Sequence, residues 1–203
     1  RSITGYSSKG DNNGWYFIAT PVAEGTTPSE DNGVLAGSYD LYYYNEPTHY
    51  WFNYKSHDGN EDPGFTQDGG KLLNGKGYLY ANTVDADLSF EGATVAANAK
   101  VTIPLNYTTD LTPEGLRGFN LVGNPFTYNL TEDSDIKLGG VEFATYYRIE
   151  EGVGITSTSI IDSPIQPGVG FMVQATGTGQ NLVFNPSAKG RAVTKPSYIR
   201  IMA

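Results

Sequence analysis

The 203-residue chain contains no cysteine, only two histidines, and no apolar run long enough for a membrane-spanning helix. The lack of cysteine excludes disulfides, thiolate metal ligands and a cysteine nucleophile. Two histidines are too few for a three-histidine zinc site, and neither a G-x-S-x-G nor an H-E-x-x-H motif is present. A membrane helix needs about 20 predominantly apolar residues, so we expect no direct membrane insertion. Because no catalytic motif is present, we predict that the protein is not an enzyme.

Basic residues are also scarce. Lysine and arginine number 13 against 22 acidic residues, which gives a net charge of -9 and a pI of about 4.6. This charge repels phosphate backbones, so we expect no nucleic-acid partner. Glycine, proline and tyrosine are abundant, with 25, 11 and 15 residues. Such a composition is typical of many short strands separated by turns.

The chain does contain a four-block pattern in residues 14–90 that returns in the same order in residues 118–184. The blocks pair 14–22 with 118–126, Tyr42-Tyr43 with Tyr146-Tyr147, 75–80 with 168–173, and 88–90 with 182–184. Recurrence in order indicates duplication of a structural unit. We therefore predict two sequence-related halves, residues 1–105 and 106–203, packed as one unit or as two close subdomains.

Both halves carry strand signals. The runs at 15–20 and 119–124 are apolar on both faces, as in central strands, and each is followed by a proline, which cannot donate into a ladder. Further strands are predicted at 39–45, 49–55, 77–83, 95–105, 143–149, 155–161, 170–176 and 198–202. Hairpins in place of crossover helices imply antiparallel sheets packed face to face. The predicted fold is all-β, an antiparallel β-sandwich of jelly-roll-like type.

Eight aromatic residues fall within sixteen positions of the first predicted hairpin, 39–54. An exposed aromatic row stacks on sugar rings or anchors a protein partner, which makes Tyr42, Tyr44 and Trp51 candidate ligand-binding residues. The alternative is that these side chains are cross-strand pairs that close the core. Matching tyrosines in the second half favour the core interpretation, and the exposure of the three residues distinguishes the two.

The first half also carries an insertion around residues 56–64 that the second half lacks. An insertion peculiar to one half is free to serve function, so His57 and Asp58 join the candidate ligand-binding residues. Carboxylate and amide oxygens are ligands that Ca²⁺ accepts. We expect no cofactor apart from a Ca²⁺ ion at this loop. The candidate calcium ligands are Asp58, Asn60, Glu61 and Asp62. The alternative is an ordinary solvated turn, which uses the same residue types.

Six strings occur in order along most of the chain: GWYFIATP, YDLYYYNE, WFNYK, NGKGYLYAN, GFNLVGNPF and PGVGFMVQA. In this order they resemble large secreted or outer-surface proteins of Bacteroidetes of the adhesin type. The resemblance implies an extracellular, β-rich module at a bacterial cell surface, joined to other domains of a longer chain. It supplies no catalytic motif and no binding residues.

Three functions are compatible with these observations. The first, which we expect, is a non-catalytic surface module for adhesion that binds a glycan or a host or cell-surface protein. The second is a purely structural or spacer domain of a large surface protein, with its aromatic residues buried. The third is an accessory or catalytic domain of a glycan hydrolase, which requires two carboxylates about 5 to 9.5 Å apart across a cleft.

Overall fold

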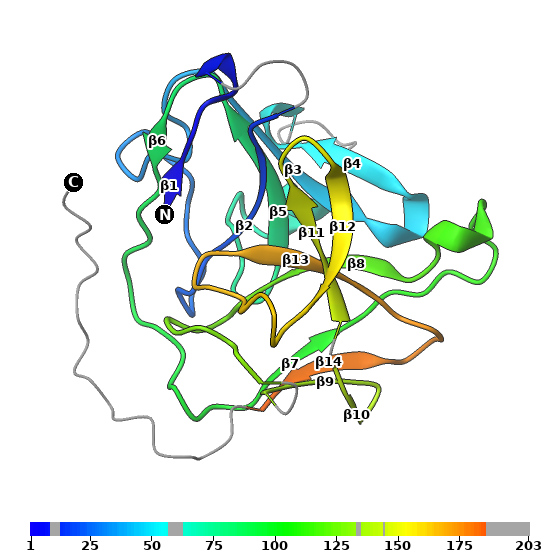
Figure 1. The fold of residues 1–203 in the computed structure, drawn as a ribbon. Coiled ribbons are helices and arrows are strands. Elements are labelled where there is room, and N and C mark those ends of the chain that lie inside the picture. Colours follow the sequence, from blue (N-terminus) through cyan, green and yellow to red (C-terminus); the bar gives the residue numbers. More distant parts are fainter. Residues whose placement is uncertain (9–12, 57–62, 133–134, 144, 186–203) are drawn as a thin grey trace.

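The computed structural model describes residues 1–8, 13–56, 63–132, 135–143 and 145–185, and Figure 1 shows that strands dominate the fold. The helices among these residues are all short: α1 (Pro63–Gln67) and the 3-10 helices η1 (Tyr6–Ser8), η2 (Glu46–Thr48), η3 (Tyr54–Ser56) and η4 (Glu114–Leu116). None of the described helices is long and apolar enough to cross a membrane. Neighbouring strands in every described sheet run antiparallel, which confirms the predicted antiparallel β architecture.

Two four-stranded sheets follow the same path through the chain. The first sheet has the order β2-β5-β3-β4, and the second sheet has the order β8-β13-β11-β12. The strands of the first sheet are β2 (Trp15–Ala19), β3 (Tyr39–Asn45), β4 (Tyr50–Asn53) and β5 (Gly77–Asn82). Those of the second sheet are β8 (Phe119–Gly123), β11 (Thr145–Glu150), β12 (Gly154–Ser159) and β13 (Gly170–Gln174). In each sheet the first strand along the chain pairs with the fourth, the fourth with the second, and the second with the third.

A third sheet lies at the opposite end of the molecule from the short pair β1 (Ser2–Ile3) and β6 (Ala86–Asp87) (Figure 1). Its order is β10-β9-β14-β7. The strands are β7 (Val101–Pro104), β9 (Ile136–Leu138), β10 (Val141–Glu142) and β14 (Asn181–Phe184). β7 precedes residue 105 but pairs with β14, and the division of the chain at that residue stays a prediction.

The strand ladders of the first and second sheets share one register. Phe17 lies opposite Leu79 on β5, and Leu121 lies opposite Met172 on β13. The first sequence block aligns Phe17 with Leu121, and the third block aligns Leu79 with Met172. The side chains that meet across the two ladders therefore occupy equivalent positions.

The second sequence block is shifted by one residue from this register. Tyr42 lies opposite Leu79, and Tyr147 lies opposite Met172, so the ladders equate Tyr42 with Tyr147. The sequence alignment had instead paired Tyr43 with Tyr147. A shift of one residue moves a side chain to the other face of a sheet. Accordingly, Tyr43 is buried in the core of the first sheet, whereas Tyr147 packs between the sheets.

Three apolar clusters hold these layers together. The largest joins the second and third sheets through fully buried residues such as Phe171 and Phe184. Another lies under the outer face of the first sheet around Tyr78 and Tyr80. A smaller cluster joins the first and second sheets, with Phe17, Leu121 and Met172 at its centre and Tyr44, Trp51, Leu79, Phe119, Tyr147 and Ile149 packed against it.

The contacts between the first and second sheets occur twice, with the partners exchanged. The backbone N–H of Ala19 donates to the carbonyl of Gly168 at 3.0 Å, and the N–H of Gly123 donates to the carbonyl of Gly75 at 2.9 Å. The isolated bridges between Ile18 and Val169 and between Lys76 and Val122 repeat the exchange. Exchanged contacts of this kind are the pattern of a two-fold, self-complementary interface.

Glycine at the entry of β5 and β13 permits this approach. A Cβ atom at Gly170 would lie 2.8 Å from the carbonyl oxygen of Ile18, and a Cβ atom at Gly77 would collide with the carbonyl oxygen of Val122. The backbone of the opposite sheet therefore occupies the space that a side chain would need at both positions. A larger residue at either position would push the sheets apart.

Candidate functional site

A cleft of about 570 Å³ opens between the start of β2 and the β11–β12 hairpin. We call it the open cleft. Its lining includes Trp15, Phe17 and Leu79 of the first sheet, Arg148, Ile149, Glu150 and Ile155 of the second sheet, and Arg1 and Glu151. The volume lies in the range of about 300 to 1,000 Å³ that is typical of small-molecule sites. The cleft is thus large enough for a ligand of one or a few rings.

Trp15 supplies an aromatic ring to this cleft. Its side chain lies on the face of β2 that carries Phe17, because alternate residues of a strand share a face. The Trp15 ring packs against Tyr42 of β3, with ring centroids 6.1 Å apart and planes tilted by 52°. Trp15 is half-buried, so part of its ring surface stays accessible to a ligand.

Arg148 supplies hydrogen-bond donors from the opposite wall. Its Nη1 donates to Ser163 Oγ at 2.8 Å, and its Nη2 lies 3.9 Å from Glu150 Oε2. The Nε atom is buried and has no hydrogen-bond partner among the described residues. The Arg148 side chain is 41% exposed. Ser163 and Glu150 therefore position the guanidinium, while 41% of the Arg148 side chain stays exposed.

The charges along the open cleft balance, although the chain as a whole is acidic. Two arginines, Arg1 and Arg148, line it together with Glu150 and Glu151. Burial lowers the pKa of the Arg1 guanidinium to about 10, which still leaves it protonated at neutral pH. Its Nη1 donates to two backbone carbonyl oxygens at 2.9 and 2.8 Å. Balanced charges favour a neutral ligand with both donors and acceptors over a polyanion or a polycation.

The equivalent position on the other side of the sheet interface is filled, and we call it the closed groove. There the β3–β4 hairpin lies against the start of β8. The Glu46 carboxylate is buried and accepts hydrogen bonds from the N–H of Gly118 at 2.8 Å and from the N–H and Oγ1 of Thr108 at 2.9 and 2.8 Å. Tyr44 and Trp51, with ring centroids 5.0 Å apart, pack into the inter-sheet cluster beside this carboxylate.

The residues predicted from the aromatic hairpin have different surroundings. Tyr42, Tyr44 and Trp51 are all half-buried. None of them is fully buried in the core, so all three stay candidate ligand-binding residues. Tyr44 and Trp51 pack in the closed groove, whereas Tyr42 contacts Trp15 at the open cleft. Tyr42 is therefore the one of the three that lies beside the candidate site.

The residues predicted from the insertion cannot be placed. His57, Asp58, Asn60, Glu61 and Asp62 lie outside the described residues. Within the described parts of the chain, no group of three or more histidine, aspartate or glutamate side chains is arranged to hold a metal ion. The calcium site and the ligand-binding role of His57 and Asp58 stay predictions.

Sequence reasoning missed Trp15 and Arg148 as site residues. Trp15 occupies the same place in the first block as Phe119, which marked it as a core position. Arg148 follows the paired tyrosines of the second half, and nothing in the sequence places it near β2. Only the packing of one sheet on the other brings the two residues to one cleft.

No protein-family model, curated protein or solved structure matches this chain. The open cleft is therefore interpreted from the chemistry of its own residues.

Proposed function

We propose that the protein is a non-catalytic binding module whose open cleft takes a neutral saccharide. The observation that carries this proposal is the pairing of an accessible Trp15 ring with a charge-balanced polar wall that includes Arg148 and Glu150. A sugar ring offers an apolar face that stacks on an aromatic ring and hydroxyl groups that both donate and accept hydrogen bonds. A mostly apolar pocket with a few placed polar groups is the usual form of a small-molecule site.

The setting of this function is also a proposal. The resemblance to secreted adhesin-type proteins favours an extracellular module at a bacterial cell surface, in which neighbouring domains belong to the same longer chain. A few aromatic and hydrogen-bonding contacts give only modest affinity, on the order of micromolar to millimolar. Such a module would gain strength from several copies acting together.

We further propose that the architecture is a jelly-roll-like β-sandwich of two sequence-related halves. Support comes from the shared strand order of the first and second sheets, from their common register at Phe17 and Leu121, and from the exchanged contacts between them. If the two sheets had not arisen by duplication, each of these three features would need a separate explanation.

A structural or spacer role is the second candidate. It is favoured by the closed groove, where Tyr44 and Trp51 serve packing. The hydrolase alternative has less support, because the two glutamates that line the open cleft, Glu150 and Glu151, are adjacent in the chain. A glycosidase needs two carboxylates that flank the bond to be cleaved.

An array of plant, bacterial and host glycans tests the proposal, followed by calorimetric titration of each glycan that binds. Trp15→Ala and Arg148→Gln are each expected to weaken binding about tenfold or more, which corresponds to roughly 1.4 kcal/mol per tenfold. Tyr50→Ala is the matched control, because Tyr50 is an aromatic residue of the same sheet that is 60% exposed and lies outside the cleft lining. An array without any bound glycan, or a Trp15→Ala variant with unchanged affinity, would favour the spacer role.

A further inference from the structure

The face of the first sheet that carries Trp15 continues beyond the open cleft. Trp15 lies opposite Ala81 on β5, and Ala81 lies opposite Asp40 on β3. Tyr42 is two residues from Asp40 and so shares its face. Its ring contacts Trp15, so the aromatic surface runs from the cleft across β5 to β3.

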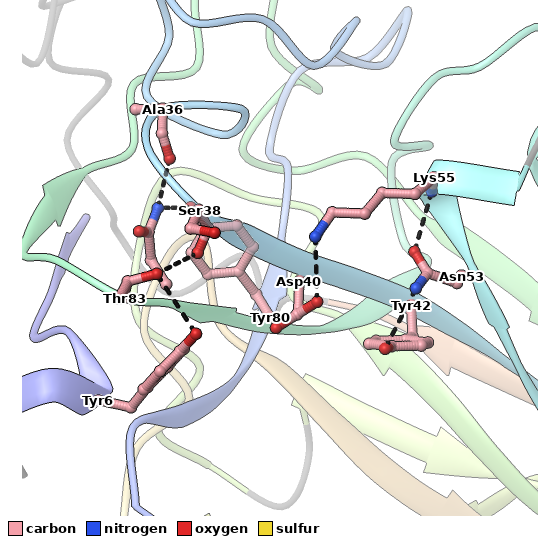
Figure 2. A network of polar contacts seen from close by, with 10 residues as sticks. Tyr6, Ala36, Ser38, Asp40, Tyr42, Asn53, Lys55, Tyr80 and Thr83 are labelled. Atoms are coloured by element: carbon pink, nitrogen blue, oxygen red, sulfur yellow. Dashed lines mark hydrogen bonds and ion pairs between the residues drawn. The ribbon is translucent and has the colours of Figure 1, made fainter.

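Polar groups extend this surface to the edge of the sheet, as Figure 2 shows. Asn53 Nδ2 donates to the Tyr42 hydroxyl at 3.2 Å, and Asn53 Oδ1 accepts from the Lys55 N–H at 2.9 Å. Lys55 Nζ donates to Asp40 Oδ1 at 3.2 Å. We call these four residues, Asp40, Tyr42, Asn53 and Lys55, the Tyr42 platform.

The Tyr42 hydroxyl is left with a hydrogen to donate. Its oxygen already accepts from Asn53, and no acceptor for its own hydrogen is found among the described residues. Burial, together with the nearby Asp40 carboxylate, raises the pKa of Tyr42 above its usual value, so the phenol is protonated at neutral pH. Tyr42 thus offers one ring face and one directed donor.

The platform repeats the chemistry of the cleft. Asp40 and Lys55 supply one charge of each sign, and their side chains are 30% and 44% exposed. Tyr42 does not belong to the apolar cluster that joins the two sheets, so its ring is not part of that core. An aromatic ring with a balanced pair of charges therefore occurs twice along one sheet face.

We infer that the saccharide bound by this protein is an extended chain of several sugar units, which starts in the open cleft, passes Trp15 and Tyr42, and reaches the Asp40–Lys55 pair. This inference rests on the proposed function, because it assigns the length of the ligand to a site that the cleft defines. A ligand confined to the cleft would gain nothing from the Tyr42 platform.

Titration with three neutral oligosaccharide series tests the inference: β-1,4-linked glucose, β-1,4-linked mannose and α-1,4-linked glucose, each from one to six units. In a series that binds, the affinity of the wild-type protein is expected to rise about tenfold between the shortest bound sugar and the six-unit chain. Binding with no dependence on length would overturn the inference and leave the proposed function standing. Absence of binding in all three series and on the glycan array would overturn both.

Three variants of the Tyr42 platform show which of its residues cause the rise in affinity with chain length. Tyr42→Ala should abolish most of the rise with length, measured within this variant as the ratio of the affinities for the six-unit chain and for the shortest bound sugar. Lys55→Met, an exposed change that keeps the hydrophobic stem, should reduce the rise in part. Tyr42→Phe keeps the ring and its packing, so loss of part of the rise in this variant would come from the missing hydroxyl. If Tyr42→Phe and Tyr42→Ala both keep the full rise in a correctly folded protein, the platform does not bind the chain.

Discussion

The open cleft and the closed groove occupy equivalent places on either side of the sheet interface, yet one is hollow and the other is filled. In the strand ladders, Tyr44 of the first sheet occupies the same position as Ile149 of the second sheet. The residue paired with Tyr44 is Trp51, and the residue paired with Ile149 is Ile155. At the closed groove the two aromatic rings pack against the cluster around Phe17. At the open cleft Ile155 is 54% exposed and leaves space beside Trp15.

The acidic residues that follow these positions diverge in the same way. Glu46, two residues after Tyr44, is 1% exposed and fastens the β3–β4 hairpin to Thr108 and Gly118. Glu151, two residues after Ile149, is exposed at the cleft. One hairpin is thus fixed by a buried glutamate, while the corresponding glutamate of the other hairpin is exposed.

This difference teaches that the two sides of the sheet interface contribute different properties. A side that is filled and hydrogen-bonded contributes to stability, because buried donors have their acceptors and apolar area is removed from water. A side that is left open keeps aromatic and charged groups available for a ligand, which is where we place binding.

The largest effect is expected at Glu46. Glu46→Ala removes the acceptor of three hydrogen bonds and leaves the buried N–H of Gly118 and the partly buried donors of Thr108 unsatisfied, which we expect to lower the free energy of unfolding by about 3 kcal/mol. The matched control is Glu151→Ala at the equivalent exposed position, with an expected change within about 0.5 kcal/mol. Urea unfolding of both variants makes the measurement. Equal losses in the two variants would contradict the division between the sides.

A smaller effect on stability is expected when Trp51 of the closed groove and Ile155 of the open cleft are each replaced by the residue at the equivalent position. Trp51→Ile should lower the free energy of unfolding by about 1 to 2 kcal/mol, because part of the buried ring area is lost. Ile155→Trp should instead fill the open cleft and weaken saccharide binding about tenfold, with a stability change of less than about 1 kcal/mol. Thermal unfolding and calorimetric titration measure the two outcomes. Unchanged binding in a folded Ile155→Trp protein would show that the ligand does not use this wall.

Much of the strand pattern was predictable because strand signals are local. The apolar runs at 15–20 and 119–124 became β2 and β8, and the predicted strands at 77–83 and 170–176 became β5 and β13. The predicted strand at 95–105 is shorter, Val101–Pro104, because the residues before it form a turn closed by a hydrogen bond between Ala99 and Ala96. Local sequence does not show where such a turn interrupts an apolar run.

The site was less predictable because it depends on contacts between distant parts of the chain. Trp15 and Arg148 are far apart in sequence and meet only when the two sheets pack. The offset of the second block also concealed that Ile155 occupies the position in the second sheet that Trp51 occupies in the first sheet. An alignment in the correct register would have shown a tryptophan replaced by a smaller residue, which is a signal for a cavity.

The smallest expected effect is a pH dependence confined to the closed groove. Burial, and secondarily repulsion by Glu46, raises the pKa of Tyr44 from its usual 10.0 to about 12. Between these values the unfolded chain releases the phenol proton while the folded chain keeps it, so the stability that this group contributes is present below pH 10 and is lost as the pH rises toward 12. Tyr44→Phe removes the titrating group, and urea unfolding across this range should show a shallower decline than in the wild-type protein. Other buried tyrosines of the first sheet, such as Tyr78 and Tyr80, also have raised pKa values, so a decline of the same sign remains in the variant. The exposed Tyr50→Phe change controls for the loss of a phenol as such, and a Tyr44→Phe protein with the wild-type slope would show that this ring is not held in the groove. The equivalent residue at the open cleft is Ile149, which has no proton to release, so this part of the pH dependence belongs to the filled side alone.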